Sequence, residues 1–400
     1  MDDVDVPKLK VLNCLPRAHF GGSQWRVATV ARALQPLGVE TCILIPQDPD
    51  TGFRKFLELH QIPLQEFVWH VPARLGLWRN NLRFMLQLPN QIIRLARLFR
   101  CQDIDLVHVN AGANIAPVLA CVLSGHPLLW HWNDLLVPSW LGQCLKLLAL
   151  SPMVHIVASS AQVAQKYQLA QIGGRYLGLL PPPLPQHDAR KSVEETELKL
   201  PQDRPIIGFV GSLLEKKGAL DFIATVALMK RQGTRVRGLM VGSAPSTQDR
   251  FYQIMMRKIR EFGIEEDIEL IGFRHDVPAL LSRMDALLFP SHTEAAGIVV
   301  LEALAMGVPL VATPVGHVPE LLEGLAMPIV PIGDVAAMAT GLSRLIGMSS
   351  SAREAYRNAA QHRVADGFSA KEIAARHLAL YDTVAASSAA RAAQASNATA

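Results

Sequence analysis

The sequence predicts an α/β protein made of two doubly wound domains of parallel strands. Its 400 residues exceed the roughly 150 of one average domain. Half of the residues are hydrophobic and 18% are charged, which favours large buried cores and excludes a disordered chain. Apolar runs typical of buried strands alternate with segments of helical period in both halves of the chain.

The first domain is expected over residues 1–185. A glycine-rich turn, Gly21-Gly22-Ser23, separates the first strand from a helix at 24–37 that Gly38 ends. This order is that of a βαβ unit. The predicted buried strands of this domain are 10–15, 39–46, 105–109 and 154–158.

A proline-rich stretch, Leu180 to Pro185, marks the end of the first domain, and the polar run after it predicts an extended linker at 186–204. The second domain is expected over 205–366. A C-terminal helix at 367–384, packing back on the first domain, and a disordered or frayed tail at 385–400 complete the chain. The predicted strands of the second domain are 206–210, 236–241, 268–271, 286–289 and 309–312.

Charge and cysteine content exclude several classes of protein. The net charge of +4 is too small for the basic footprint of a nucleic-acid-binding protein. Five cysteines without a C-x-x-C pair exclude a disulfide framework or a zinc knuckle. The first residues, Met-Asp-Asp-Val-Asp, are acidic where an export signal is basic, so we expect a cytoplasmic protein.

A basic amphipathic segment lies at residues 74–100, where six arginines occur without an acidic residue. At helical spacing Arg94 and Arg97 share one face. Two interpretations stay open: peripheral contact with an anionic membrane at its inner face, or an outer helix of the first domain with a solvated basic face. The opposite, apolar face would consist of Ile92, Leu95, Leu98 and Phe99.

The most informative segment runs from Phe289 to Pro309 and reads FPSHTEAAGIVVLEALAMGVP. A strand is expected to end at its start and a helix to begin near Gly297. Glu294 lies in the loop before this helix and Glu302 within it. Carboxylates accept hydrogen bonds from sugar and ribose hydroxyls, and the free N–H groups of a helix N-terminus bind phosphate. A nucleotide-sugar suits both kinds of group, although a single glutamate is more commonly just solvated.

This segment resembles the donor-binding signature of retaining glycosyltransferases of the GT-B fold, in particular glycosyltransferase family 4, also called glycosyl transferases group 1. The likeness extends upstream to Gly208–Gly218 and Gly272–Arg274, and downstream to Pro314–Glu320. It implies two Rossmann-like domains facing each other across a cleft, the first binding the acceptor and the second the donor. The family pattern of two glutamates followed by Ala-x-Ala-x-Gly-x-Pro is matched by Glu294, Glu302, Ala303, Ala305, Gly307 and Pro309.

The resemblance also implies roles for single residues. Lys217 would pair with the donor diphosphate, Glu294 would orient the hexose and Glu302 the ribose. His131, after a middle strand of the first domain, would face the transferred sugar, so Glu294, His131 and Lys217 are the implied catalytic residues. The other implied donor contacts are Gly21, Gly22, Gly211, Ser212, Arg274, Gly297, Ile298 and Val299.

The chain departs from the family at four places, one of which is the absence of the familiar Asn-Gly-Val-Asp stretch from Gly178 to Pro185. Ser212 stands where the family usually has an arginine, so Lys216 or Arg274 would have to supply the second cation. Ala295-Ala296 replaces a common Pro-Phe, and His317 replaces a second glycine. Asp276 and Asp285 lie near predicted sheet ends of the second domain, but neither belongs to a D-x-D pair and no histidine cluster offers ligands there, so we expect neither a metal nor a cofactor besides the nucleotide-sugar substrate.

The function implied is retaining transfer of a sugar from a nucleotide diphosphate-sugar, UDP- or GDP-linked, to a hydroxyl of a glycan, lipid-linked or small-molecule acceptor. Two alternatives stay open. A nucleotide-sugar 2-epimerase-like isomerase shares this architecture, and a non-catalytic GT-B module that binds a nucleotide or a partner is motivated by Ser212. A dinucleotide dehydrogenase is disfavoured because no G-x-G-x-x-G follows the first strand.

Overall fold

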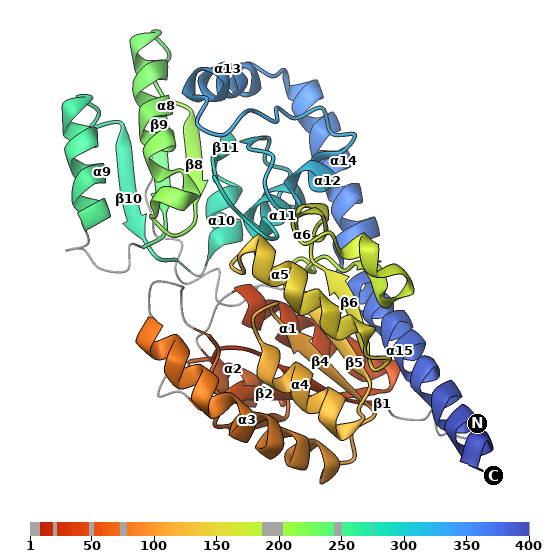
Figure 1. The fold of residues 1–400 in the computed structure, drawn as a ribbon. Helices are drawn as coiled ribbons and strands as arrows, with labels where there is room; N and C mark the ends of the chain where they lie inside the picture. Colours follow the sequence, from red (N-terminus) through yellow and green to blue (C-terminus); the bar gives the residue numbers. More distant parts are fainter. Residues whose placement is uncertain are drawn as a thin grey trace. The chain divides into compact units, whose positions relative to one another are not determined.

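The computed structural model describes residues 9–18, 22–47, 52–72, 78–185, 203–243, 250–274 and 276–399. The chain divides into two compact units: residues 1–183 with 370–400 form unit 1, and residues 184–369 form unit 2. Each unit contains one parallel sheet covered by helices (Figure 1). The α/β class and the doubly wound parallel sheets expected from the sequence are thereby confirmed.

The sheet of unit 1 has seven parallel strands in the order β3-β2-β1-β4-β5-β6-β7. Because helices cover both faces, the central strands are almost continuous apolar runs. The chain order reverses between β1 and β4, which is where open sheets of this kind bind ligands. The strands are β1 (Leu9–Cys14), β2 (Val39–Pro46), β3 (Leu64–Phe67), β4 (Leu106–Asn110), β5 (Leu128–Trp132), β6 (Val154–Ala158) and β7 (Tyr176–Leu179).

Two layers of helices enclose this sheet. One face carries α3 (Trp78–Arg100), α4 (Ile115–Ser124), α5 (Ser139–Leu145) with the 3-10 helix η2 (Lys146–Leu150), and α6 (Ala161–Lys166), packed on the core around Trp130 and Trp132. The other face carries α1 (Gly22–Leu34), α2 (Gly52–Leu59) and α15 (Ala370–Thr399). Short 3-10 helices η1 (Gln35–Leu37) and η3 (Leu169–Arg175) complete the unit.

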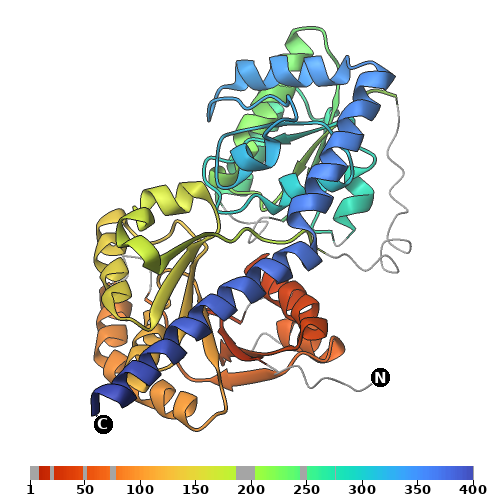
Figure 2. The same ribbon diagram turned by 90° about the vertical axis from the view of Figure 1, so that its right-hand side faces the viewer.

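The C-terminal helix α15 is part of unit 1 although it follows unit 2 in the sequence. It lies across the strands of the unit 1 sheet (Figure 2) and packs against α1, β4 and β5. Ile373, Tyr381 and Val384 are fully buried there. Residues 385–400, expected to be disordered or frayed, instead continue α15 to Thr399. Nine alanines in this stretch explain the helix, because alanine is the strongest helix former.

The sheet of unit 2 has five parallel strands in the order β10-β9-β8-β11-β12, and its order reverses between β8 and β11. The strands are β8 (Ile206–Val210), β9 (Arg237–Val241), β10 (Ile268–Gly272), β11 (Ala286–Phe289) and β12 (Leu310–Ala312). The helices are η4 (Glu215–Lys217), α8 (Ala219–Arg231), α9 (Arg250–Glu261), α10 (Val277–Leu281), α11 (Ile298–Ala305), α12 (Val318–Leu322), α13 (Val335–Ile346) and α14 (Ser350–Phe368).

The chain passes between the units twice, and both passages meet in unit 2. The first follows Pro183 and the second precedes Ala370. The N–H of Leu184 donates to the carbonyl of Phe368 at 2.7 Å, so the two connecting segments are neighbours where they join unit 2. Most of the linker expected at 186–204 lies outside the described residues. No helix in the described ranges is long and apolar enough to cross a membrane.

Candidate active site

An ion pair between Lys217 and Glu294 lies at the point where the strand order of unit 2 reverses. Lys217 ends η4, which follows β8, and Glu294 lies in the loop after β11. The ammonium group of Lys217 donates to Glu294 Oε2. Their side chains remain 24% and 21% exposed, so both are within reach of a ligand. The sequence predicted these two residues as site residues, and the fold brings them together.

Two glycines allow the loops of this site to approach one another. Gly218 has φ +73°, and a Cβ there would lie 2.0 Å from the carbonyl oxygen of Pro290. Gly316 has φ +61°, and a Cβ there would lie 2.9 Å from the carbonyl oxygen of Glu294. Side chains at these positions would therefore push the Lys217 turn and the Glu294 loop away from their neighbours.

Helix α11 begins directly after the Glu294 loop. Gly297 precedes it in the left-handed conformation, with φ +71° and no side chain capping the helix. The Ile298 and Val299 side chains are half-buried in the first turn. Glu302, expected on the flank of the helix, is only 7% exposed. The helix N-terminus thus offers backbone N–H groups beside Glu294, and these groups favour anions.

The remaining predicted donor contacts of unit 2 lie at the carboxyl ends of neighbouring strands. Gly211 and the exposed Ser212 follow β8. Arg274 follows β10, and its guanidinium binds Asp276 through two hydrogen bonds of 2.8 and 2.7 Å. Because Asp276 is buried, Arg274 is held as a fixed pair and differs in this from an isolated surface cation. Lys216, the other proposed second cation, is exposed in η4.

His292 was missed by the sequence analysis. Its backbone N–H donates to the carbonyl of Lys216 at 3.0 Å, which ties the Lys217 turn to the Glu294 loop. Its ring Nε2 lies 2.6 Å from Asp221 Oδ2, at the start of α8. The signal was present in the sequence, since His292 precedes Glu294 by two residues. We regard His292 as a positioning residue of this site.

Unit 1 has a buried polar cluster at the corresponding edge of its own sheet. Asn13, Asn110 and His131 lie near the carboxyl ends of β1, β4 and β5. Arg26 of α1 reaches them: its Nη1 lies 2.6 Å from His131 Nδ1, and its Nη2 donates to Asn110 Oδ1. Asn110 Nδ2 in turn donates to Asn13 Oδ1 at 2.6 Å. All four side chains are at most 7% exposed.

The cluster continues through two more histidines to α15. The His108 ring stacks on His131 with centroids 5.6 Å apart, and its Nδ1 lies 2.9 Å from Tyr381 Oη. His377 Nδ1 lies 2.7 Å from the carbonyl oxygen of Ile373. This chain of contacts joins the middle of the sheet to the C-terminal helix.

Burial sets the charges in this cluster. It lowers the pKa of Arg26 to about 10 and that of His377 to about 3. Burial, together with nearby positive charge, holds the pKa of His131 and of His108 well below the usual 6.5. At neutral pH the histidines are uncharged and Arg26 is protonated. In the described ranges no carboxylate contacts its guanidinium.

The predicted residues of unit 1 therefore have different surroundings from those of unit 2. His131 lies within β5 and its side chain is fully buried, in contact with Arg26 and His108. Its role toward the transferred sugar stays a prediction. Gly22 is the first residue of α1, and Gly21 lies outside the described residues.

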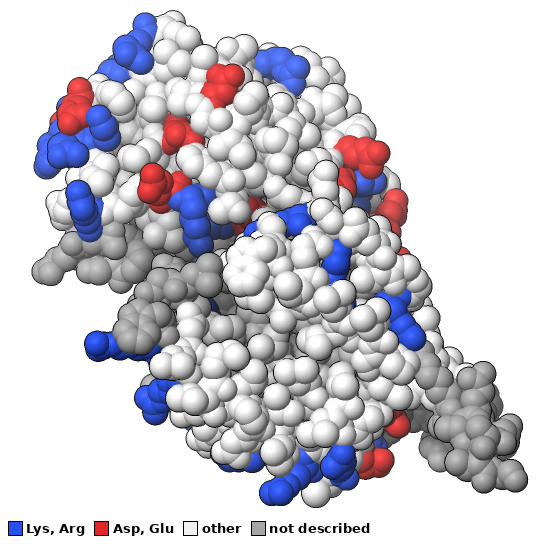
Figure 3. All heavy atoms as spheres, in the orientation of Figure 1, with Lys and Arg blue, Asp and Glu red and all other residues white. Residues whose placement is uncertain are grey.

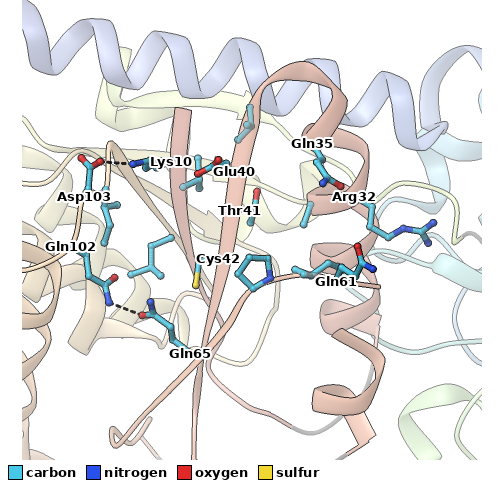
Figure 4. A pocket seen from close by; sticks show the side chains of 17 residues that line it. Lys10, Arg32, Gln35, Glu40, Thr41, Cys42, Gln61, Gln65, Gln102 and Asp103 are labelled. Carbon is cyan, nitrogen blue, oxygen red and sulfur yellow. Dashed lines mark hydrogen bonds and ion pairs between the residues drawn. The ribbon is translucent and has the colours of Figure 1, made fainter. Parts of the chain in front are cut away.

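A hollow of about 610 Å³ lies at the opposite, amino-terminal edge of the unit 1 sheet (Figure 4). The starts of β1, β2 and β3 line it, and two side-chain pairs, Lys10 with Asp103 and Gln102 with Gln65, border it. None of the predicted site residues lines this hollow. Across the described residues, no three His, Cys, Asp or Glu side chains are placed to hold a metal ion, and metal independence stays a prediction.

Solved structures with the same architecture define the fold of the protein. The Anabaena protein HepE, determined in complex with UDP, superposes with a TM-score of 0.74 at 20% identity, over 94% of this chain and 100% of that chain. A sucrose-phosphate synthase from Thermosynechococcus elongatus superposes with a TM-score of 0.70 at 19% identity, over 95% and 100%. The fold is therefore GT-B, with two Rossmann-like domains.

Two family models match the chain. The model for Glycosyltransferase Family 4 matches residues 20–173, and that for Glycosyl transferases group 1 matches residues 204–348. The protein belongs to this family of glycosyltransferases, which confirms the resemblance seen in the sequence.

A curated relative matches over part of its length. The capsular polysaccharide biosynthesis glycosyltransferase CapM of Staphylococcus aureus is 29% identical over 195 residues, which are 48% of this chain and 49% of CapM. The chain thus spans about half the length of this relative.

Proposed function

We propose that the protein is a retaining glycosyltransferase that moves a sugar from a nucleotide diphosphate-sugar to a hydroxyl of a glycan, lipid-linked or small-molecule acceptor. The observation that carries the proposal is the Lys217–Glu294 pair at the strand-order reversal of unit 2, next to the N-terminus of α11. HepE was determined with UDP, and CapM is named for polysaccharide synthesis, which supports a UDP-linked donor and a glycan acceptor.

Donor binding would separate the two charges of the pair. The diphosphate takes Lys217 and the N–H groups at the start of α11, and Glu294 is then released to accept hydrogen bonds from the hexose hydroxyls. As the anomeric bond loosens, negative charge grows on the departing diphosphate, and Lys217 stabilises it there. Glu302 is assigned to the ribose and His131 to the sugar or acceptor side.

The leaving diphosphate is also the base for the acceptor in this proposal. It departs from the face that the acceptor hydroxyl approaches, so it can take the hydroxyl proton there and the anomeric configuration is retained. No metal is required, because the cation and the helix N-terminus carry the neutralising charge. Because Ser212 carries no charge, any second cation would be Lys216 or Arg274, which is paired with Asp276.

Nucleotide binding is the first test. A thermal-shift series with UDP, GDP, ADP and their glucose conjugates is run with and without chelator on wild type, Glu294→Gln and Lys217→Ala. A ligand at 100 times its Kd adds about 2.7 kcal/mol of stability. A shift with one base, unchanged by chelator, is expected. No shift with any nucleotide would contradict donor binding and favour a non-catalytic module that binds a partner.

Product analysis separates transfer from isomerisation. A 2-epimerase converts the nucleotide-sugar to its epimer with no acceptor present, whereas a transferase releases nucleotide diphosphate in proportion to glycosylated acceptor. Epimer formation without acceptor would overturn the transferase proposal.

We further propose that the protein works in the cytoplasm and meets the inner face of the membrane through the basic segment 74–100. Five arginines of α3 are exposed, which supports attraction to anionic lipid, and Arg74 lies outside the described residues.

A further inference from the structure

The outer helical layer of unit 1 exposes an unusual amount of apolar surface. Helices α3, α4 and the continuous α5–η2 segment share this layer, because their inward sides pack into one core. Their outward sides carry large apolar side chains that are each 39–79% exposed. We call these the outer apolar face: Leu82, Met85, Leu86, Ile93, Val122, Leu123, Trp140, Leu147 and Leu150.

The positions repeat with helical period, so they form rows. On α3, Leu82 is followed by apolar residues three and four positions later, and on α5–η2 Trp140 is followed by Leu147 and Leu150. Isolated exposed leucines are ordinary on protein surfaces, whereas rows on neighbouring helices mark an interaction surface.

The structure corrects which side of α3 can meet a membrane. The apolar side expected from the sequence includes Leu95 and Phe99, and both are fully buried against the sheet. That side is therefore core, as in an outer Rossmann helix. The exposed apolar row lies instead around Leu82 and Met85, in the first half of the helix.

Basic residues outnumber acidic residues around this face. Residues 67–185 contain nine lysines and arginines but only three aspartates and no glutamate. Two of the aspartates, Asp103 and Asp105, come after the end of α3, and burial raises the pKa of the third, Asp134. In Figure 3 the surface over α3, α4 and α5 is almost entirely uncharged, and its margins carry mostly basic groups, with acidic groups at the lower right.

We propose that the outer apolar face docks on an anionic lipid bilayer. The apolar rows would enter the region between headgroups and acyl chains, Trp140 would lie at the headgroup level, and the arginines of α3 would meet lipid phosphates. Pairing with a second copy of this chain is less favourable, because it would bring two arginine-rich helices together. This inference names the surface behind the proposed membrane contact and is independent of the transfer chemistry.

Vesicle flotation tests the apolar contribution. Wild type is expected to float with phosphatidylglycerol-containing vesicles and much less with phosphatidylcholine alone. In the triple variant Leu82→Ser, Met85→Ser, Leu86→Ser, each substitution should lower the vesicle partition coefficient about tenfold or more. The matched control is Leu59→Ser, Phe262→Ser, Ile332→Ser, which removes exposed apolar groups elsewhere and should float like wild type. Equal flotation of both triple variants would overturn the proposal.

A charge variant tests the arginines. Arg79→Gln, Arg83→Gln, Arg97→Gln should weaken flotation at low salt, with less effect at high salt. Arg231→Gln, Arg257→Gln, Arg260→Gln removes the same charge from exposed positions of unit 2 and should have little effect. If the two variants lose binding equally, net charge rather than this face governs the attraction.

Trp140 reports on the contact directly. The emission difference between wild type and Trp140→Phe isolates this side chain, and brominated anionic lipid should quench it. Absence of quenching while the protein floats would overturn the placement of α5 at the bilayer. Light scattering without vesicles completes the test: self-association that the Leu82 triple variant abolishes would assign the face to a second copy of the chain. All these readouts omit nucleotide, so their failure and the failure of donor binding are distinguishable.

Discussion

The two units use the same edge of a parallel sheet in opposite ways. In unit 2 the polar groups at the strand-order reversal are partly exposed and paired with one another: Lys217 with Glu294, and His292 with Asp221. In unit 1 the corresponding groups are buried, and Arg26 contacts only neutral groups in the described part of the chain. Paired, accessible charges can exchange their partners for a ligand, whereas a buried network holds its members, His131 included, in fixed positions.

Removing Arg26 should have the largest effect on stability. Arg26→Ala leaves the buried His131 Nδ1 without its donor and Asn110 Oδ1 with only the 3.4 Å hydrogen bond from Asn133 Nδ2, so a loss of about 1–3 kcal/mol in the free energy of unfolding is expected. Arg32→Ala changes an exposed arginine of the same helix and should stay within about 0.5 kcal/mol. Chemical denaturation measures both. Equal stabilities would mean that the cluster does not support unit 1.

Acid should weaken unit 1 more than unit 2. His108, His131 and His377 stay neutral in the folded state below their usual pKa of 6.5, whereas the unfolded chain binds protons there. Stability is therefore highest above pH 6.5 and falls as the pH decreases, down to about pH 3 for His377. At pH 5.5 each of these histidines should lower the free energy of unfolding by about 1.4 kcal/mol relative to neutral pH.

Hydrogen exchange resolved by unit, at pH 7.5 and 5.5, measures this effect. His377→Phe should reduce the pH dependence of unit 1, while substitution of the exposed His362 to Phe should not. An equal loss of protection in both units would argue against the cluster as the origin of the acid sensitivity.

Glu294→Gln should abolish most transfer without unfolding the protein. Loss of the carboxylate that orients the sugar is expected to lower kcat by about 10²–10³-fold, in the range found for removing one transition-state contact. Glu215→Gln, an exposed glutamate in η4, is the control. Wild-type turnover by Glu294→Gln would remove Glu294 from the site, and Tm values of both variants exclude misfolding as the cause.

Lys217→Ala should have a smaller effect, on nucleotide diphosphate affinity. Loss of a charge-assisted hydrogen bond costs about 1.5–3 kcal/mol, so Kd should rise about ten- to hundredfold. The neighbouring Lys216→Ala removes a candidate second cation and, in the same titration calorimetry, should raise Kd less than Lys217→Ala does. The reverse order of the two effects would identify Lys216 as the diphosphate cation.

The sequence allowed the strands and the exposed site to be predicted better than the buried cluster. Strands with both faces covered are short apolar runs, so β8 and β11 were predicted with their observed bounds, whereas the half-buried β3 and β7 were missed. The buried β5 was missed as well, because its run Leu-Leu-Trp-His-Trp is interrupted by His131. Lys217 and Glu294 were found because they occupy motif positions. Arg26 was missed because its partners lie 84 and 105 residues away, and burial that depends on such distant contacts leaves no local pattern.

The place of α15 has a consequence for how the protein is made. The core of unit 1 requires Ile373, Tyr381 and Val384, which leave the ribosome after all of unit 2. Unit 2 is contiguous in the chain and can fold as soon as it is synthesised. The domain that begins synthesis first is therefore the last to be completed, and until then the side of its sheet that α15 covers stays open to chaperones and to aggregation.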